Sequence, residues 1–157
     1  MVHSFPTRRS SDLALEPHDR ILEVGTGSGY MTALIAHFGG RVYSVDIVPE
    51  FTQSAAGKLA SHGISNATLE TGDAARGWER HAPYDAIVLT GSVPVLPEAF
   101  QLHLAPGGRL LAIVGEPPVM EARLITRAGA GAWSTIGLFE TCIAPLRNAM
   151  QPERFVF

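Results

Sequence analysis

Cysteine is nearly absent from this sequence, because Cys142 is the only one among 157 residues. An internal disulfide and a cysteine-based metal cluster are therefore excluded, and we interpret Cys142 as a small buried apolar side chain. Long apolar runs are missing too: residues 110–115 are no longer than a strand, whereas a membrane-spanning helix needs about 20 apolar residues. Residues 1–20 offer no apolar stretch typical of a secretory signal. We therefore expect no membrane partner and a cytoplasmic location.

An excess of positive charge is also lacking. The 12 Lys and Arg residues stand against 15 Asp and Glu residues, which gives a formal net charge of −3. Binding to nucleic acid through its phosphates needs clustered basic residues, so we expect no nucleic-acid partner. The 6 histidines are dispersed without the spacing of metal ligands, so we expect no metal site. The length and the 46% hydrophobic content indicate one globular domain.

Short apolar runs alternate with segments of helical spacing from residue 20 to residue 114. The expected strands cover residues 20–25, 41–46, 67–71, 85–90 and 109–114, and the expected helices cover residues 28–38, 49–62 and 96–104. Such alternation predicts an α/β fold with a parallel sheet that is covered on both faces.

The pattern changes after residue 118. Residues 121–127 and 133–140 are two strand-like runs joined by a short Ala/Gly segment, which predicts an antiparallel β-hairpin at one edge of the sheet. Residues 145–157 have no clear period, and we expect an ordered segment held by Phe155 and Phe157. Residues 1–12 fit neither a helix nor a strand. We interpret them as a disordered or non-native leader, which leaves residues 13–157 as the domain.

A glycine-rich segment, EVGTGSGY (residues 23–30), follows the first expected strand and opens the first helix. In a parallel sheet this position lies at the carboxyl edge, where glycines let backbone N–H groups approach a ligand. Asp46 closes the second strand, where an acid can accept hydrogen bonds from both ribose hydroxyls. Asp73 follows the third strand, where it can meet the exocyclic amine of adenine. A glycine-rich turn without a ligand is the alternative, but the three signals together favour a pocket for an adenosine compound.

Two absences indicate which adenosine compound the pocket takes. A dinucleotide fingerprint requires glycine where this sequence has Tyr30, which disfavours an NAD-dependent dehydrogenase. A Gly-Lys-Ser/Thr sequence is also missing, which excludes a P-loop phosphate site. Glu23 can pair with a ligand ammonium group, which S-adenosylmethionine carries and NAD lacks.

Five segments occur in the order and spacing of class I S-adenosylmethionine-dependent methyltransferases. They are EVGTGSGY (23–30), RVYSVDIVPE (41–50), GDA (72–74), YDAIVLTG (84–91) and LAPGGRLLAIVG (104–115). The sequence most resembles the protein-L-isoaspartate O-methyltransferase family, particularly a bacterial branch of it, over residues 13–146. The resemblance implies a Rossmann-like class I methyltransferase fold. It also implies S-adenosyl-L-methionine as the cofactor and methyl transfer to an isoaspartyl carboxylate of damaged proteins.

The resemblance further implies a set of cofactor-binding residues. Gly25, Thr26, Gly27 and Ser28 would line the methionine and ribose end of the cofactor, together with Glu23. Further binding residues, taken in chain order, would be Asp46 on the ribose, Ile47 on the adenine ring, Gly72, Asp73 and Ala74 at the adenine edge, and Thr90 facing the methyl group. No catalytic residue is assigned.

One part of the family pattern has no counterpart here. Members carry a helical region before the first strand, with a motif of the Gly-Gln-Thr-Ile-Ser-Gln-Pro type that binds the isoaspartyl substrate, and residues 1–13 do not match it. We therefore expect weak or absent isoaspartyl activity, and a monomer or weak self-association through exposed apolar surface. Two alternatives stay open: a non-catalytic cofactor-binding or interaction module, and a methyltransferase that acts on another acceptor.

Overall fold

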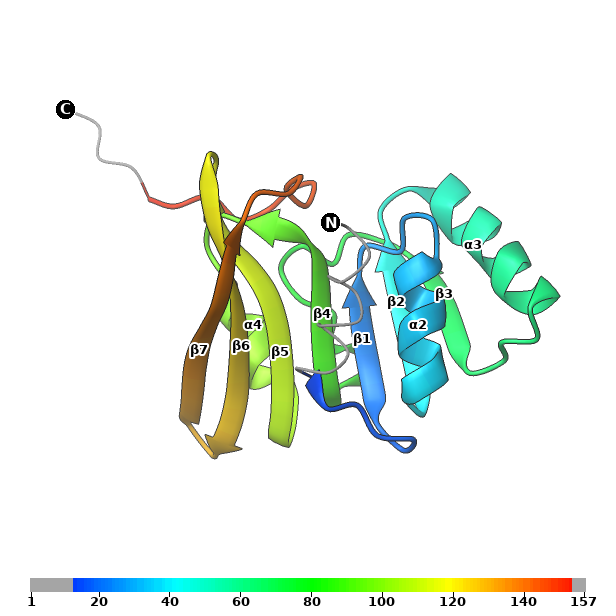
Figure 1. Cartoon of the computed structure of the whole chain (residues 1–157), viewed down its shortest axis with the longest axis horizontal. Coiled ribbons are helices and arrows are strands. Elements are labelled where there is room, and N and C mark those ends of the chain that lie inside the picture. Colours follow the sequence, from blue (N-terminus) through cyan, green and yellow to red (C-terminus); the bar gives the residue numbers. More distant parts are fainter. Residues whose placement is uncertain (1–12, 154–157) are drawn as a thin grey trace.

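The computed structural model describes residues 13–153, which form a seven-stranded sheet in the order β3-β2-β1-β4-β5-β6-β7 (Figure 1). The strands are β1 (Arg20–Val24), β2 (Arg41–Asp46), β3 (Ala67–Thr71), β4 (Tyr84–Val93), β5 (Leu104–Glu116), β6 (Val119–Gly129) and β7 (Ala132–Thr141). Strands β1 to β5 pair in parallel, whereas β5, β6 and β7 pair antiparallel. The predicted parallel sheet and its edge hairpin are both confirmed.

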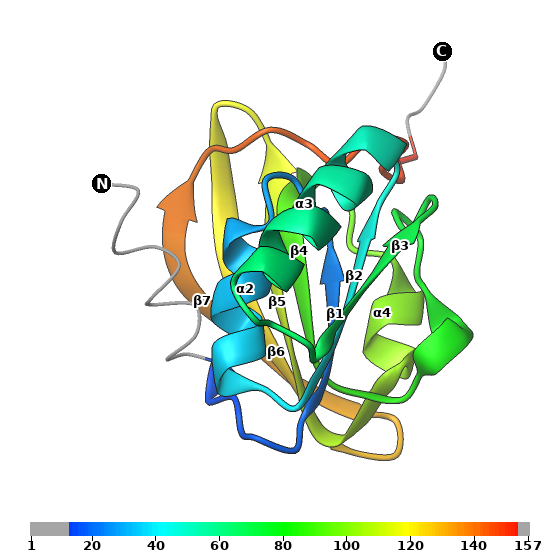
Figure 2. The same cartoon turned by 90° about the vertical axis from the view of Figure 1, so that its right-hand side faces the viewer.

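Helices cover both faces of the sheet. The helices α2 (Tyr30–Phe38) and α3 (Pro49–Ser61) lie on one face, and α4 (Glu98–Leu102) and the short 3-10 helix η1 (Glu79–His81) lie on the other (Figure 2). Because successive side chains of a strand point to opposite faces, Leu110 of β5 packs in one core cluster with Phe100 of α4, whereas Leu111 packs in a second cluster with Ile35 of α2. This two-sided burial explains why the central strands are continuously apolar.

The element boundaries differ from the predictions mainly around α4. This helix begins at Glu98, after Pro97 in an extended conformation, and ends at Leu102. The next strand already begins at Leu104, which pairs with Tyr84 of β4. An irregularity in the pairing follows, so that residues 105–108, which were expected to separate the helix from the strand, lie inside β5.

The interpretation of Cys142 is wrong, because this residue is exposed. It comes directly after β7, where the chain has left the sheet. The predicted leader and the two phenylalanines, Phe155 and Phe157, lie outside the described residues. Within residues 13–153, no helix has the length and apolar character needed to cross a membrane.

Candidate functional site

A cavity of about 150 Å³ lies at the carboxyl ends of β1, β2 and β3. Parallel strands bring their carboxyl ends to one edge of the sheet, and β1 lies where the strand order reverses, which is where open α/β sheets bind ligands. Six of the predicted site residues line this cavity: Gly25, Asp46, Ile47, Gly72, Asp73 and Ala74. The sequence analysis missed eight further lining residues: Val24, Val45, Val48, Phe51, Ala75, Pro145, Leu146 and Arg147.

Asp46 joins the end of β2 to the glycine-rich loop. Its Oδ2 accepts a hydrogen bond of 3.0 Å from the backbone N–H of Gly27, and its Oδ1 accepts one of 2.9 Å from the backbone N–H of Val48. A carboxylate offers about four acceptor positions, so two remain for a ligand after these bonds. Asp46 is therefore held in one orientation at the cavity and can still accept bonds from a pair of hydroxyl groups.

Gly25 turns the chain at the end of β1. Its φ of 100° is a conformation that residues with a side chain rarely adopt. A Cβ at this position would lie only 2.1 Å from Oγ1 of Thr90. That hydroxyl lies 2.8 Å from the carbonyl oxygens of both Val24 and Gly25, which share its single proton. Thr90 is not among the residues that line the cavity, and its observed contact is with the turn that forms the cavity wall.

Glu23 and Thr26 point into the protein interior, not into the cavity. Glu23 is fully buried, and its Oε1 accepts hydrogen bonds from the hydroxyls of Ser44 and Thr32. Thr26, which is also buried, lies with its Oγ1 2.6 Å from Oγ of Ser44. Because the Ser44 proton goes to Glu23, Thr26 donates to Ser44. This chain of hydroxyl groups ties the glycine-rich loop to β2 and α2.

Ser28 lies on the outer side of the glycine-rich loop. Its side chain is exposed and accepts a long hydrogen bond of 3.4 Å from the backbone N–H of Tyr30. It lines a separate groove between α2 and α3 together with Tyr30 and Leu59. The structure therefore does not bring Ser28 to the cavity that holds the two acids.

The loop after β3 carries Asp73 to the cavity. Oδ1 of Asp73 accepts a hydrogen bond of 3.0 Å from the backbone N–H of Ala75, which fixes a tight local turn. Gly72 lies against the indole ring of Trp78, since a Cβ there would come within 2.6 Å of that ring. The position needs glycine because the aromatic ring supports the loop from behind.

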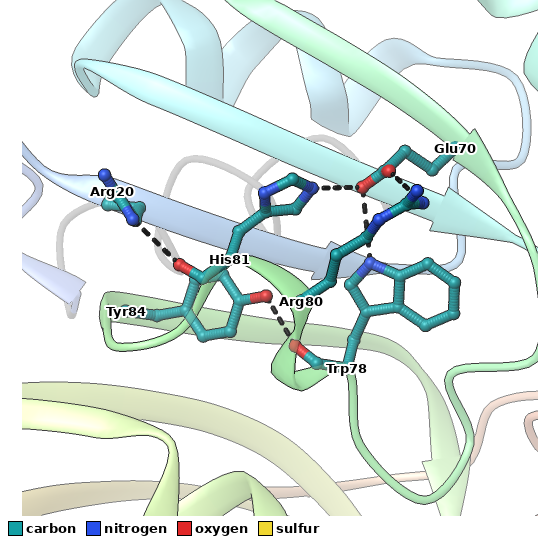
Figure 3. A network of polar contacts seen from close by, with 6 residues as sticks. All are labelled: Arg20, Glu70, Trp78, Arg80, His81 and Tyr84. Carbon is teal, nitrogen blue, oxygen red and sulfur yellow. Dashed lines mark hydrogen bonds and ion pairs between the residues drawn. The ribbon is translucent and has the colours of Figure 1, made fainter.

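A polar network holds Trp78 in place (Figure 3). The carboxylate of Glu70 accepts hydrogen bonds from Trp78 Nε1 at 3.3 Å and from Arg80 Nη1 at 2.8 Å, and it lies 2.8 Å from Nε2 of His81. The hydroxyl of Tyr84 donates to the carbonyl oxygen of Trp78 at 2.5 Å. Burial of the Tyr84 ring raises the pKa of its phenol from 10.0 to about 12.

The segment from Ile143 to Ala149 crosses the carboxyl edge of the sheet and forms one wall of the cavity. Ser92, at the end of β4, donates from its N–H to Ala144 at 3.0 Å and accepts from the N–H of Leu146 at 2.9 Å. Leu146 lies against Gly91, where a Cβ would come within 2.8 Å of its side chain. The sequence had no periodic signal for this segment, because its position depends on contacts with β4, about 50 residues away in the chain.

The cavity suits part of a nucleoside. Two carboxylates, Asp46 and Asp73, lie at one cavity with the apolar side chains of Ile47, Phe51 and Leu146. Apolar surfaces accept the faces of a purine ring, while the acids accept hydrogen bonds from its amine and from ribose hydroxyls. Typical pockets for drug-sized ligands measure about 300 to 1,000 Å³, so a cavity of about 150 Å³ encloses only part of such a molecule.

The chain is similar in sequence to proteins of one family. A family model described as "Protein-L-isoaspartate(D-aspartate) O-methyltransferase (PCMT)" matches residues 7–148. The chain is 39% identical over 150 residues to protein-L-isoaspartate O-methyltransferase 1 of Anaeromyxobacter sp. (strain Fw109-5), covering 94% of this chain and 69% of that protein.

Two solved structures share the fold. A protein-L-isoaspartate O-methyltransferase superposes with a TM-score of 0.82 at 25% identity, over 90% of this chain and 46% of that one. An isoaspartate methyltransferase from Plasmodium falciparum, in complex with S-adenosyl-L-homocysteine, superposes with a TM-score of 0.79 at 22% identity, over 93% of this chain and 73% of that one. The predicted Rossmann-like class I methyltransferase fold is confirmed.

The chain spans 57% to 69% of the length of four relatives that it matches by sequence. The family model nevertheless covers most of the chain, including the glycine-rich loop, Asp46, Asp73 and the part of the segment after β7 that reaches residue 148. The chain belongs to the protein-L-isoaspartate(D-aspartate) O-methyltransferase family.

Proposed function

We propose that this chain binds S-adenosylmethionine in the cavity at the carboxyl edge of the sheet, and that it serves methyl transfer to isoaspartyl carboxylates in proteins. The observation that carries the proposal is the meeting of Asp46, at the end of β2, and Asp73, in the loop after β3, at one cavity. Family membership and the complex of a structural relative with S-adenosyl-L-homocysteine support it. We also propose a cytoplasmic location and a monomer or weakly associating state.

The residues divide into two groups in this proposal. Asp46 accepts hydrogen bonds from the ribose, and Asp73 with Ala74 contacts the adenine edge, while Ile47 packs on the ring. The second group acts through the glycine-rich loop. Glu23 and Thr26 hydrogen-bond to Ser44, and Thr90 hydrogen-bonds to the backbone of Gly25. These bonds fix the position of the loop, including Gly25 and Gly27. Ser28 keeps the role that the family resemblance implies only if the loop rearranges around a ligand.

The proposed methyl transfer needs no acid or base catalyst from the chain. S-adenosylmethionine, when bound, supplies a methyl group activated by a sulfonium. A carboxylate acceptor with an ordinary pKa near 4 is already ionised at pH 7, so no residue of the chain must remove a proton. The contribution of the chain is then alignment and exclusion of water, and good positioning alone supplies about 7 to 11 kcal/mol of barrier reduction.

Calorimetric titration with S-adenosylhomocysteine tests the binding step. We expect binding by the unchanged chain and a loss of affinity of about 10- to 100-fold in Asp46→Asn, because a hydrogen bond to a charged group is lost. Glu140→Gln, on β7, removes the same charge away from the cavity and serves as the control. No heat with the unchanged chain, or equal loss in both variants, would contradict the proposal.

A labelled-methyl transfer assay tests the second step, with an isoaspartyl peptide and the matching aspartyl peptide. The prediction of weak or absent activity concerns this step alone, and turnover typical of the family would refute it. Weak transfer to the isoaspartyl peptide alone would support the proposed acceptor, whereas binding without any transfer agrees with the predicted loss of activity and equally with the non-catalytic cofactor-binding module. Small carboxylate, amine and alcohol substrates test other acceptor classes. Transfer to one of them would favour a methyltransferase that acts on an acceptor other than isoaspartyl residues.

A further inference from the structure

The segment after β7 does more than close one wall of the cavity, because it also reaches Asp73. Nδ2 of Asn148 donates a hydrogen bond of 3.0 Å to Oδ2 of Asp73, across 75 positions of the chain. Asn148 has a φ of 59°, a left-handed conformation that asparagine tolerates better than most residues. The N–H of Ala149 bonds to the carbonyl oxygen of Leu146, which closes a turn around Asn148.

Asp73 is therefore held from two sides. The backbone N–H of Ala75 binds Oδ1 and the side chain of Asn148 binds Oδ2, each at 3.0 Å. Two donors from separate segments fix both torsions of the carboxylate, and each oxygen keeps an acceptor position for a ligand. Since Asn148 itself is not among the lining residues of the cavity, its effect on a ligand passes through Asp73.

We propose that Asn148 is a positioning residue that orients Asp73 to select adenine by its exocyclic amine. This inference rests on the proposed function, because it takes an adenosyl ligand as the occupant of the cavity. An amine donates to the oriented carboxylate, whereas the carbonyl oxygen of hypoxanthine would face it as a second acceptor. The segment after β7 thus contributes to base specificity.

The experiment compares two ligands, S-adenosylhomocysteine and S-inosylhomocysteine, by calorimetry with the full chain. In Asn148→Ala we expect adenosyl binding to weaken by about threefold to tenfold, the usual range for one lost hydrogen bond. We expect inosyl binding to change by less than twofold, so the preference for adenine falls. Gln151→Ala is the matched control, since the Gln151 side chain donates to the carbonyl oxygen of Ala149 nearby and forms no hydrogen bond with Asp73 among the described residues.

A double-mutant cycle adds a readout that a purely structural role would not move. In an Asp73→Ala background, Asn148→Ala should leave both affinities unchanged, because its only route to the ligand is gone. An equal loss of affinity for both ligands in Asn148→Ala would show that Asn148 only maintains the structure of the cavity wall. Tighter adenosyl binding would show that Asn148 competes with adenine for Asp73. Either result overturns this inference and leaves the proposed function standing, whereas no adenosyl binding by the unchanged chain overturns both.

Discussion

Tyr84 has an environment that makes its phenol less acidic. Its side chain is fully buried at the start of β4, and its hydroxyl donates to the carbonyl oxygen of Trp78. Burial disfavours the charged phenolate and raises the pKa to about 12. Because Trp78 supports the loop that carries Asp73, the protonated phenol also stabilises one side of the candidate site.

This pKa predicts a loss of stability at high pH. Below pH 10 the phenol is protonated in both the folded and the unfolded chain, so its full contribution to the free energy of unfolding is present. Between pH 10 and pH 12 the Tyr84 phenol ionises in the unfolded chain but stays mostly protonated in the folded chain. The free energy of unfolding therefore falls by about 2 kcal/mol over this range.

Urea unfolding at several pH values between 9 and about 12 measures the effect, compared between the unchanged chain and Tyr84→Phe. We expect the variant to be less stable at pH 9, because the bond to Trp78 is lost, and to lose less stability as the pH rises. The other tyrosines titrate in both proteins and cancel in the comparison. Parallel curves would show that Tyr84 ionises in the folded chain as easily as in water.

Glycine is required in the loop after β1 but is unfavourable in α3. Gly25 has a positive φ, and Thr90 occupies the space of a Cβ. Gly57 lies in the interior of α3, where the space for a Cβ is open. The same substitution by alanine is therefore strained in the loop and favourable in the helix.

We expect Gly25→Ala to lower the free energy of unfolding by about 2 kcal/mol or more, from backbone strain and from contact with Thr90. Gly57→Ala should raise it by about 0.5 to 1 kcal/mol, since alanine has the higher helix propensity. Chemical denaturation of both variants checks the two signs. A neutral Gly25→Ala would mean that the turn relaxes without cost.

The element pattern was largely predictable from the sequence. The ranges expected for β2 and β3 match those of the structure, because these β-branched and apolar runs have a glycine at one end, Gly40 before β2 and Gly72 after β3. The end of α3 was signalled by Gly63, which has a φ of 72°. By contrast, α4 has only 5 residues, and a helix this short depends on packing of Phe100 more than on periodicity.

At the scale of the whole molecule, β7 is one of the two terminal strands of the sheet, opposite β3. It carries one charged side chain, Glu140, and its Ile136 is 57% exposed. A terminal strand with few charges pairs easily with another copy, whereas lysine on such a strand prevents that pairing. The expectation from the sequence was a monomer or weak self-association, and we place any such association on β7.

We expect Ile136→Lys to reduce self-association, measured by sedimentation over a range of concentrations. Leu102→Lys is the control, because Leu102 is a similarly exposed apolar residue, 52% exposed, at the end of α4. If the unchanged chain sediments as a monomer at every concentration, or if both variants behave alike, the edge strand does not drive association.

The candidate site was predictable only where its residues are close to a strand end. Asp46, Ile47 and Asp73 were identified because each follows a recognisable strand, and parallel pairing brings those ends together. Glu23 and Thr26 were expected to line the cofactor, but their side chains point inward to Ser44. That direction depends on how the loop packs under α2.

The amino-acid sequence by itself determined the order of strands and helices, the glycine-rich turn and the two acids, because these depend on local periodicity and backbone conformation. Only the tertiary structure decided which side chains meet at the cavity, and it added Leu146 and Arg147 and linked Asn148 to Asp73. The physical reason is that these contacts join segments many residues apart. Their geometry follows from the packing of the sheet edge and not from any pattern within one segment.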